Sequence, residues 1–488
     1  MNALAPFGPR TGVRSYLSIA FLLLFCCCFP GFVHTADAAL GVPGKLPERS
    51  GKDARLLHAI LSRLADQRAE VVSIQRELVS RPALNPLLGG SGEDDKARWI
   101  EGWLRSKGLP PAERLDSPDE RVPSAVRPNL ILRHPGFTGR TLWIIGHLDV
   151  SPPGPENLWT GSPWALRVDG DTIYGRGVED NHQSIVAGLL LYEALVKEKV
   201  TPPIGLGLLF TAGGKEYPRK HGLQYVFEAR PGLVKPFDMV VVNDYGNSEG
   251  SIIEVAEKGL LTIKVTVTGR QAHAAFTHEG VNALQAGAAF ITSLSTLKKR
   301  FPKINSLFTP DVTTFSATAP EGGDSAVNQI PGQFVFHLDC RFLPGYTADE
   351  VDAAIRTLAK VVEKDHSVSI RLERVMTTPA AYTDNISSSV IIALAEAVRE
   401  ELKKETRLVG IGASTMATEL RANNFPVAVW ANTPSLGVAA NESISVSAQL
   451  KSASVFARML YYSDLDFTQA ASQNTEKQPA DSGFKQGQ

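Results

Sequence analysis

The chain has 488 residues, of which 43% are hydrophobic and 21% charged, so it is long enough to bury more than one hydrophobic core. Its 50 Lys and Arg residues nearly match its 51 Asp and Glu residues, and this balance argues against a partner such as nucleic acid or an anionic membrane surface. These numbers exclude a largely disordered chain and favour a globular protein whose partner is a small molecule.

The first 39 residues have the composition of a targeting segment. Arg10 and Arg14 precede an apolar run over residues 16–33, and the small residues 36–38 follow it. This order predicts a secretory signal peptide over residues 1–39, so the mature chain would be periplasmic or secreted, with no membrane attachment after cleavage. A retained membrane anchor is the alternative, because the apolar run reaches the lower limit of spanning length.

Cysteine usage is typical of a fold held together by its core. Cys26, Cys27 and Cys28 lie inside the apolar run, which leaves Cys340 alone in the mature chain. An intramolecular disulfide framework is therefore excluded. A chain of this length does not need one, so the absence of disulfides is compatible with export.

The segment over residues 55–258 alternates predicted helices with predicted strands. The helices are predicted over residues 56–79 and 184–197, and the strands over residues 130–132, 141–146, 204–211 and 238–242. Polar residues follow three of the strand ends, namely His147, the pair Lys215 and Glu216, and Asp244. This pattern predicts an open, mostly parallel α/β sheet with a site along the carboxyl ends of its strands.

A different order of elements begins at residue 259. The predicted strands span residues 260–268, 313–317, 333–343 and 367–374, and the predicted helices span residues 282–297 and 348–363. The resulting β-α-β-β-α-β order predicts a compact ferredoxin-like domain inserted over residues 259–375.

After the insert the chain returns to the first sheet. Residues 387–404 predict a helix and residues 426–430 predict a strand, so the α/β domain is discontinuous and its second part spans residues 376–465. The remaining residues 466–488 are polar and aperiodic, and they predict a disordered tail.

The polar residues at the strand ends are metal-ligand types in a definite order. His147 and Asp149 follow one strand, Asp180 ends the run Gly-Arg-Gly-Val-Glu-Asp, and Glu216 and Asp244 come later. An imidazole with several carboxylates suits zinc or a similar divalent ion. A His-x-Asp sequence alone would indicate only a strand-end histidine and a helix cap, but the ordered series favours a metal site.

In the wording and order of these motifs, residues 55–465 resemble the zinc-dependent exopeptidase and deacylase family of aminoacylase, acetylornithine deacetylase, carnosinase and glutamate carboxypeptidase. The resemblance implies a sheet domain that binds two zinc ions bridged by one aspartate. It also implies an inserted lid domain through which two copies form a homodimer. The substrates would be small peptides or N-acyl amino acids, cleaved at an amide bond.

The resemblance assigns roles to individual residues of the first domain. His147 and Asp244 would bind one ion, Asp180 would bridge both ions, and Glu216 would bind the other ion. Asp149 would orient the imidazole and raise its basicity.

Three residues of the insert match positions that face the active site in the family. His273 would reach into the partner subunit's site and help to polarise the scissile carbonyl, and Asn328 and Arg341 would bind the substrate. The planar guanidinium of Arg341 would suit a substrate carboxylate. A structural arginine that pairs with Asp339 or a backbone carbonyl is the alternative.

The chain departs from the family pattern at two positions that carry chemistry. Lys215 stands where relatives have the glutamate that acts as general base, and Val438 stands where they have a histidine ligand, three residues before the pair Asn441-Glu442. No histidine follows His366, so no shift of alignment restores that ligand. The turn at residues 412–415 also lacks the family's run of glycines.

These substitutions predict a degenerate metal site. Two dications would repel an ammonium at Lys215, whereas with one ion or none Lys215 could form ion pairs with Glu216 and Asp180. We therefore expect one zinc ion per chain, or manganese or cobalt in its place, bound by His147, Asp180 and Asp244. A neutral Lys215 acting as a base is the alternative that would keep the enzyme active.

Two functions from different classes follow. One is an exported metallopeptidase or amidohydrolase whose catalytic set is Lys215, Asp149 and His273. The other is a catalytically inactive pseudo-enzyme that binds a peptide or an amino-acid derivative. A third alternative is that the order of motifs is accidental and that the chain is another α/β hydrolase.

Overall fold

The computed structural model describes residues 51–321, 326–383, 385–434 and 439–462. The predicted signal peptide, the predicted tail and Val438 lie outside these described residues. None of the helices in the described part is long and apolar enough to cross a membrane.

A nine-stranded sheet forms the first domain, in the order β1-β2-β6-β3-β7-β17-β8-β15, and β16 also pairs with β8. Strands β6, β3, β7 and β17 run parallel at its centre, and β1, β2 and β15 pair antiparallel at its margins. The open α/β sheet predicted from the sequence is confirmed. The strands are β1 (Glu113–Pro118), β2 (Val126–His134), β3 (Thr141–His147), β6 (Gly205–Thr211), β7 (Met239–Val242), β8 (Ile252–Glu257), β15 (Ala381–Tyr382), β16 (Arg407–Ile411) and β17 (Val427–Val429).

Alternate residues of β3 face two different hydrophobic cores. Leu142 and Ile144 pack with helices on one face of the sheet, and Trp143 and Ile145 pack with helices on the other face. Because both faces are covered, β3 and β6 are buried at every position. The first face packs with α1 (Gly51–Ala65), α2 (Arg68–Val79), α3 (Asp94–Ser106), α4 (His182–Lys197), α8 (Ser389–Leu402) and α10 (Val446–Met459), and the second with α5 (Leu223–Ala229) and α9 (Ala417–Ala422).

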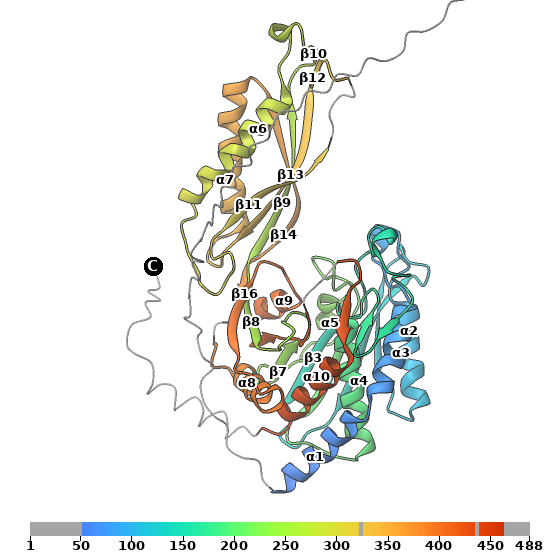
Figure 1. Ribbon diagram of the computed structural model, residues 1–488. Coiled ribbons are helices and arrows are strands. Elements are labelled where there is room, and N and C mark those ends of the chain that lie inside the picture. Colours follow the sequence, from blue (N-terminus) through green and yellow to red (C-terminus); the bar gives the residue numbers. More distant parts are fainter. Residues whose placement is uncertain (1–50, 322–325, 384, 435–438, 463–488) are drawn as a thin grey trace, which may run out of the picture. The chain divides into compact units, whose positions relative to one another are not determined.

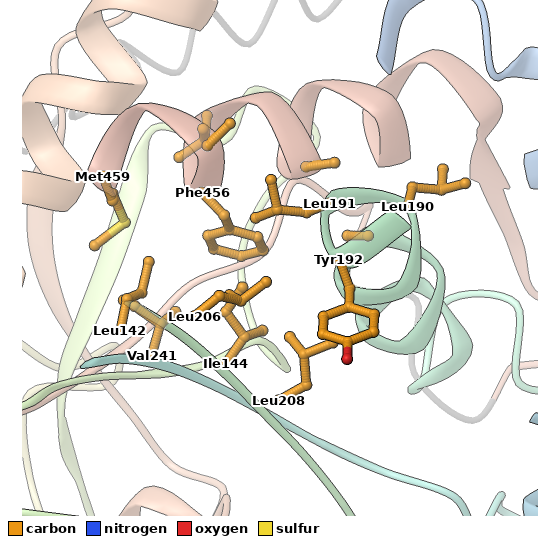
Figure 2. Packing of buried hydrophobic residues seen from close by; sticks show 14 of the residues in the cluster. Leu142, Ile144, Leu190, Leu191, Tyr192, Leu206, Leu208, Val241, Phe456 and Met459 are labelled. Atoms are coloured by element: carbon orange, nitrogen blue, oxygen red, sulfur yellow. The ribbon is translucent and has the colours of Figure 1, made fainter. Parts of the chain in front are cut away.

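Figure 2 shows how α10 closes the larger core over the sheet. Leu142, Ile144 and Leu206 of the sheet lie opposite the ring of Phe456, which is fully buried. The same ring meets Trp430 edge-on, with a centroid distance of 5.6 Å. The helix that ends the described chain is therefore packed into the core of the first domain.

The insert is built on a four-stranded antiparallel sheet in the order β11-β13-β9-β14. Helices α6 and α7 lie side by side against it (Figure 1) and enclose a separate core around Phe290, Phe336 and Ile355. The order along the chain is the predicted β-α-β-β-α-β, so the ferredoxin-like insert is confirmed. Its elements are β9 (Gly259–Thr268), α6 (Ala283–Ser293), β11 (Thr314–Glu321), β13 (Gln333–Phe342), α7 (Ala348–His366) and β14 (Ser369–Thr378), with the short pair β10 (Ala272–His273) and β12 (Gln329–Ile330).

A three-stranded sheet joins two distant parts of the first domain. Its strands β4 (Arg167–Asp169) and β5 (Thr172–Tyr174) precede Asp180, and β18 (Ser443–Ser445) follows Glu442. The pairing of β18 with β5 therefore brings Glu442 next to the loop that carries Asp180. The described 3-10 helices are η1 (Pro86–Leu88), η2 (Glu156–Leu158), η3 (Thr277–Glu279) and η4 (Leu294–Lys299).

Residues 246–250 spell Gly-Asn-Ser-Glu-Gly, a pattern that in α/β hydrolases marks a nucleophilic serine between a strand and a helix. In this fold the next element is the strand β8 and not a helix. Ser248 is therefore not held on a nucleophile elbow, which argues against another type of α/β hydrolase.

Replacing Phe456 with Ala should lower the free energy of unfolding by about 3–5 kcal/mol, because the substitution leaves a cavity in the main core. Urea denaturation followed by circular dichroism measures the change. Phe137→Ala is the matched control, since Phe137 is 71% exposed. Equal losses in the two variants would contradict the packing around Phe456.

Candidate metal centre

His147, Asp180 and Asp244 converge at the carboxyl edge of the parallel strands. His147 is the last residue of β3, Asp180 lies in the loop before α4, and Asp244 follows β7. His147 Nε2 is 3.2 Å from Asp180 Oδ1 and 3.8 Å from Asp244 Oδ1. Ligand atoms of all three residues lie within 4.8 Å of one another. His147 and Asp244 meet because parallel strands end at a common edge, and the loop before α4 brings Asp180 to the same edge.

The three groups fit a divalent metal ion. His147 is buried, and its Nε2 faces the carboxylates of Asp180 and Asp244, at 3.2 and 3.8 Å. A divalent cation among one imidazole nitrogen and two carboxylates is a recurrent arrangement in proteins. One imidazole and two carboxylates leave a coordination position open for water or a substrate. We refer to His147, Asp180 and Asp244 as the candidate metal centre.

Asp149 holds the imidazole and the neighbouring loop together. His147 Nδ1 donates to the Asp149 carbonyl oxygen at 2.9 Å and lies 3.2 Å from Asp149 Oδ1, which directs Nε2 toward the centre. The Asp149 carboxylate accepts the backbone N–H groups of Gly214 at 2.7 Å and Lys215 at 3.0 Å. Burial raises the pKa of Asp149, but the contacts with His147 and Lys215 outweigh burial and bring the pKa to about 2.

The loop after β6 passes directly over the side chain of His147. A Cβ on Gly214 would lie 2.4 Å from His147 Cβ, so a larger residue would force the loop away. Gly213 before it has a φ of +58°, a conformation that favours glycine. The two glycines therefore allow the next residue, Lys215, to reach the centre.

Lys215 enters the centre as a cation. Its Nζ contacts both carboxylate oxygens of Asp180, at 2.5 Å from Oδ1. Burial lowers the pKa of Lys215, but attraction to Asp180, Asp244 and Asp149 outweighs burial and raises the pKa above the ordinary lysine value. The predicted ion pair with Asp180 is present, and this environment favours an ammonium over a neutral base.

Glu216 points away from the centre. Its Oε1 accepts a hydrogen bond from Arg127 Nη1 at 2.7 Å, and the set of described residues that could hold a metal does not include it. Arg127 is fully buried and also donates from Nε to Glu93 at 2.6 Å. The expected pair between Lys215 and Glu216 is therefore wrong, because Lys215 pairs with Asp180 and Glu216 pairs with Arg127.

The sequence contained one indication that Arg127 is buried and paired. Arg127 lies in β2, where most neighbouring residues are buried, and a buried charge needs a buried partner. Its partners Glu93 and Glu216 are 34 and 89 positions away along the chain. The sequence could thus have indicated a paired arginine, but only the fold identifies the partners.

Glu442 supports the loop that carries Asp180. Its carboxylate accepts the backbone N–H groups of Gly177 at 2.9 Å, Glu179 at 2.8 Å and Asp180 at 3.0 Å. Arg176 Nη1 donates to the same carboxylate at 2.8 Å, and both side chains are buried. In the sequence Glu442 served only to locate position 438, where the resemblance implies a histidine. In the structure Glu442 positions Asp180.

The predicted substrate-facing residues of the insert lie in two places. His273 and Asn328 are exposed beside the β10–β12 pair, where Asn328 Nδ2 and His273 Nε2 are 3.1 Å apart. Arg341 on β13 donates to both carboxylate oxygens of Asp339, at 2.7 and 2.9 Å, and to the Gly412 carbonyl at 2.9 Å. The structural pair that was the alternative for Arg341 is therefore the observed arrangement.

Similarity to known proteins identifies the family. Residues 255–367 match the M20 model of a peptidase dimerisation domain. Over 410 residues the chain is 30% identical to an uncharacterized metallohydrolase of Methanococcus maripaludis, and the match covers 80% of this chain and 98% of that protein. This chain belongs to the M20 peptidase family.

One further protein and one solved structure are also similar to this chain. The succinyl-diaminopimelate desuccinylase of Alkalilimnicola ehrlichii is 29% identical over 292 residues, which cover 59% of this chain and 73% of that protein. The crystal structure of human carnosine dipeptidase 1 matches 87% of this chain and 100% of its own, with a TM-score of 0.67 at 17% identity, and so supports the fold alone. The resemblance proposed from the motifs is confirmed.

Protein cations already contact two of the carboxylates that the resemblance would give to a second metal ion. Lys215 already contacts Asp180, and Arg127 already binds Glu216. At the position where the resemblance implies a histidine ligand the sequence has Val438, whose side chain carries no ligand atom. An ion at that position would have to displace two protein cations.

A buried lysine braces the backbone between His147 and Asp149. The Nζ of Lys96 donates to the Leu148 carbonyl at 2.9 Å and lies 2.7 Å from His182 Nε2. Burial lowers the pKa of Lys96 to about 7, even though nearby carboxylates such as Asp149 raise it. The proton on Lys96 is therefore disfavoured in the folded chain.

Lys96 should make stability rise with pH between the folded pKa of about 7 and the unfolded pKa of ~10.4. In that window the unfolded chain keeps the proton and the folded chain releases it. The destabilisation that Lys96 causes is therefore complete below the folded pKa and is lost above the unfolded pKa. Lys96→Met should flatten this dependence, as measured by urea midpoints across the window. The control Lys220→Met, at an exposed lysine, should keep the slope of the wild type; identical slopes in both variants would contradict the assignment.

Proposed function

We propose that this chain is an exported metal-dependent hydrolase that cleaves an amide bond in a small peptide or an N-acyl amino acid. The observation that carries the proposal is the convergence of the Asp180 and Asp244 carboxylates on the buried imidazole nitrogen of His147. The metallohydrolase relative of nearly full coverage and the desuccinylase relative support the reaction class.

We propose one zinc ion per chain, with manganese or cobalt able to take its place. A divalent ion, when bound, supplies a Lewis acid that polarises a carbonyl and lowers the pKa of water. Asp149 holds the imidazole in the orientation that presents Nε2 to the ion. Glu442 holds the Asp180 loop, and Lys215 keeps a positive charge beside it.

Two features of the proposal concern assembly and location. The match to a peptidase dimerisation domain supports a homodimer formed through the insert. His273 is exposed on the insert, so it is available to stabilise negative charge in the site of a second copy. The arginines and apolar run within residues 1–39 support export to the periplasm or beyond the cell.

A second candidate is a pseudo-enzyme that binds a peptide or an amino-acid derivative without cleaving it. The observation that favours it is the ion pair of Lys215 with Asp180, because the residue in the base position holds a positive charge and cannot accept a proton from water. The M20 fold would then serve as a binding cleft.

A substrate panel separates the two candidates. Dipeptides and N-acyl amino acids, including N-succinyl amino acids, are incubated with the purified chain and added zinc, manganese or cobalt. Cleavage of any member supports the hydrolase, whereas thermal stabilisation by a ligand that stays intact supports the binding protein.

If a substrate is cleaved, His147→Ala should reduce kcat/KM to background, because it removes the nitrogen ligand of the centre. Asp149→Asn should reduce it by about 10- to 100-fold, since it alters the group that orients the imidazole. His366→Ala, at an exposed histidine of the insert, is the matched control and should leave the rate unchanged. Turnover by His147→Ala at the wild-type rate would place the chemistry elsewhere.

A further inference from the structure

We propose that Lys215 is a built-in second cation of the metal centre, which replaces a second metal ion at Asp180, while Arg127 keeps Glu216 out of the site. The inference deepens the proposed function and rests on it, because it concerns the same centre. It makes the chain a single-ion member of a family in which the resemblance implies two ions.

The first step is the position of the ammonium. Asp180 is the aspartate that would bridge two ions, and its Oδ1 lies 3.2 Å from His147 Nε2. Lys215 Nζ contacts both oxygens of the same carboxylate, so it stands where the partner cation of a bridging aspartate would stand. The backbone of Lys215 is itself held by Asp149, which makes the position a property of the fold.

The second step is the removal of Glu216. Arg127 binds Glu216 with one nitrogen and Glu93 with the other two, and all of Arg127 and Glu93 is buried. Glu93 in turn accepts the backbone N–H of Gly213 at 3.0 Å, which ties the loop to the same network. Withdrawing Glu216 would leave a buried guanidinium short of a partner. Glu216 is therefore committed to the protein and not available to an ion.

The third step is the balance of charge. Asp149, Asp180 and Asp244 contribute three negative charges, and Lys215 contributes one positive charge. A single dication brings this group to neutrality, whereas a second dication would leave it with an uncompensated positive charge. The charged groups of the centre are thus matched to one ion.

The consequence for a ligand follows from exposure. The side chain of Lys215 retains 29% of its surface, so part of it remains accessible to a ligand that enters the centre. It can therefore donate a hydrogen bond to a carbonyl or carboxylate oxygen of a bound substrate. The ammonium of Lys215 thus gives the centre a fixed positive charge that is present whether or not metal is available.

Metal stoichiometry tests the inference without any substrate. The purified full chain is titrated with ZnCl2 by calorimetry, and its metal content is measured by elemental analysis. The wild type and Lys215→Arg should bind about one equivalent, because both keep a cation at Asp180. Lys215→Glu should gain a second, weaker binding event, because it removes the cation and adds a ligand. The control Lys220→Met should behave as the wild type.

Manganese shows whether the second ion in Lys215→Glu binds beside the first ion or elsewhere on the protein surface. In Lys215→Glu loaded with Mn²⁺, electron paramagnetic resonance should show spin coupling between two ions. The double variant Glu93→Gln with Arg127→Gln, added to Lys215→Glu, should tighten the second site by at least about tenfold, because it releases Glu216 as a ligand. If that variant does not fold, the result for Lys215→Glu alone decides the role of Lys215.

Two equivalents in the wild type, or one equivalent or uncoupled ions in Lys215→Glu, would overturn the inference. These outcomes are separate from those for the proposed function. If the wild type cleaves no substrate but Lys215→Glu binds a second, spin-coupled ion, the hydrolase proposal is refuted. The role of Lys215 as a built-in cation is then still supported.

Discussion

The carboxylate of Asp149 is the group on which the candidate metal centre depends. It lies beside His147 Nδ1 and accepts the backbone N–H groups of Gly214 and Lys215. One buried side chain thereby ties the end of β3 to the loop after β6. The His147 imidazole and the Lys215 ammonium are thus positioned by backbone that Asp149 holds in place. A preorganised site requires such support. Its negative charge is tolerated in the interior because donors and cations surround it.

Other buried carboxylates hold the neighbouring loops by the same means. Glu442 supports the loop of Asp180 through its backbone N–H groups. Glu257, the last residue of β8, accepts both the N–H and the hydroxyl of Thr415, at 2.7 and 2.6 Å. This contact holds the turn at residues 412–415. A buried carboxylate that loses its donors pays a desolvation penalty, so each contact constrains its loop.

The elements that the sequence predicted best are those with a repeating apolar pattern. The parallel strands and the helices of the insert were recognised because burial on one or both faces imposes a period on the chain. Strands β1, β8 and β16 were among those missed. β1, at the margin of the sheet, is largely polar, β16 is only Arg407–Ile411, and β8 carries Glu254 and Glu257 within a fully buried run. Short or marginal strands depend on the neighbours that pair with them, and this dependence leaves little trace in composition.

The strands that precede His147 and Asp244 indicated, from sequence alone, that these two residues would gather at one edge, and the order of ligand types added Asp180 to them. Parallel strands place their carboxyl ends together whatever the rest of the chain does. Which carboxylate each cation would take was decided only by the tertiary structure. Lys215 pairs with Asp180, 35 positions away, and Glu216 pairs with Arg127, 89 positions away. Ion pairs over such separations follow from how the loops pack, because charge attracts charge without regard to sequence spacing.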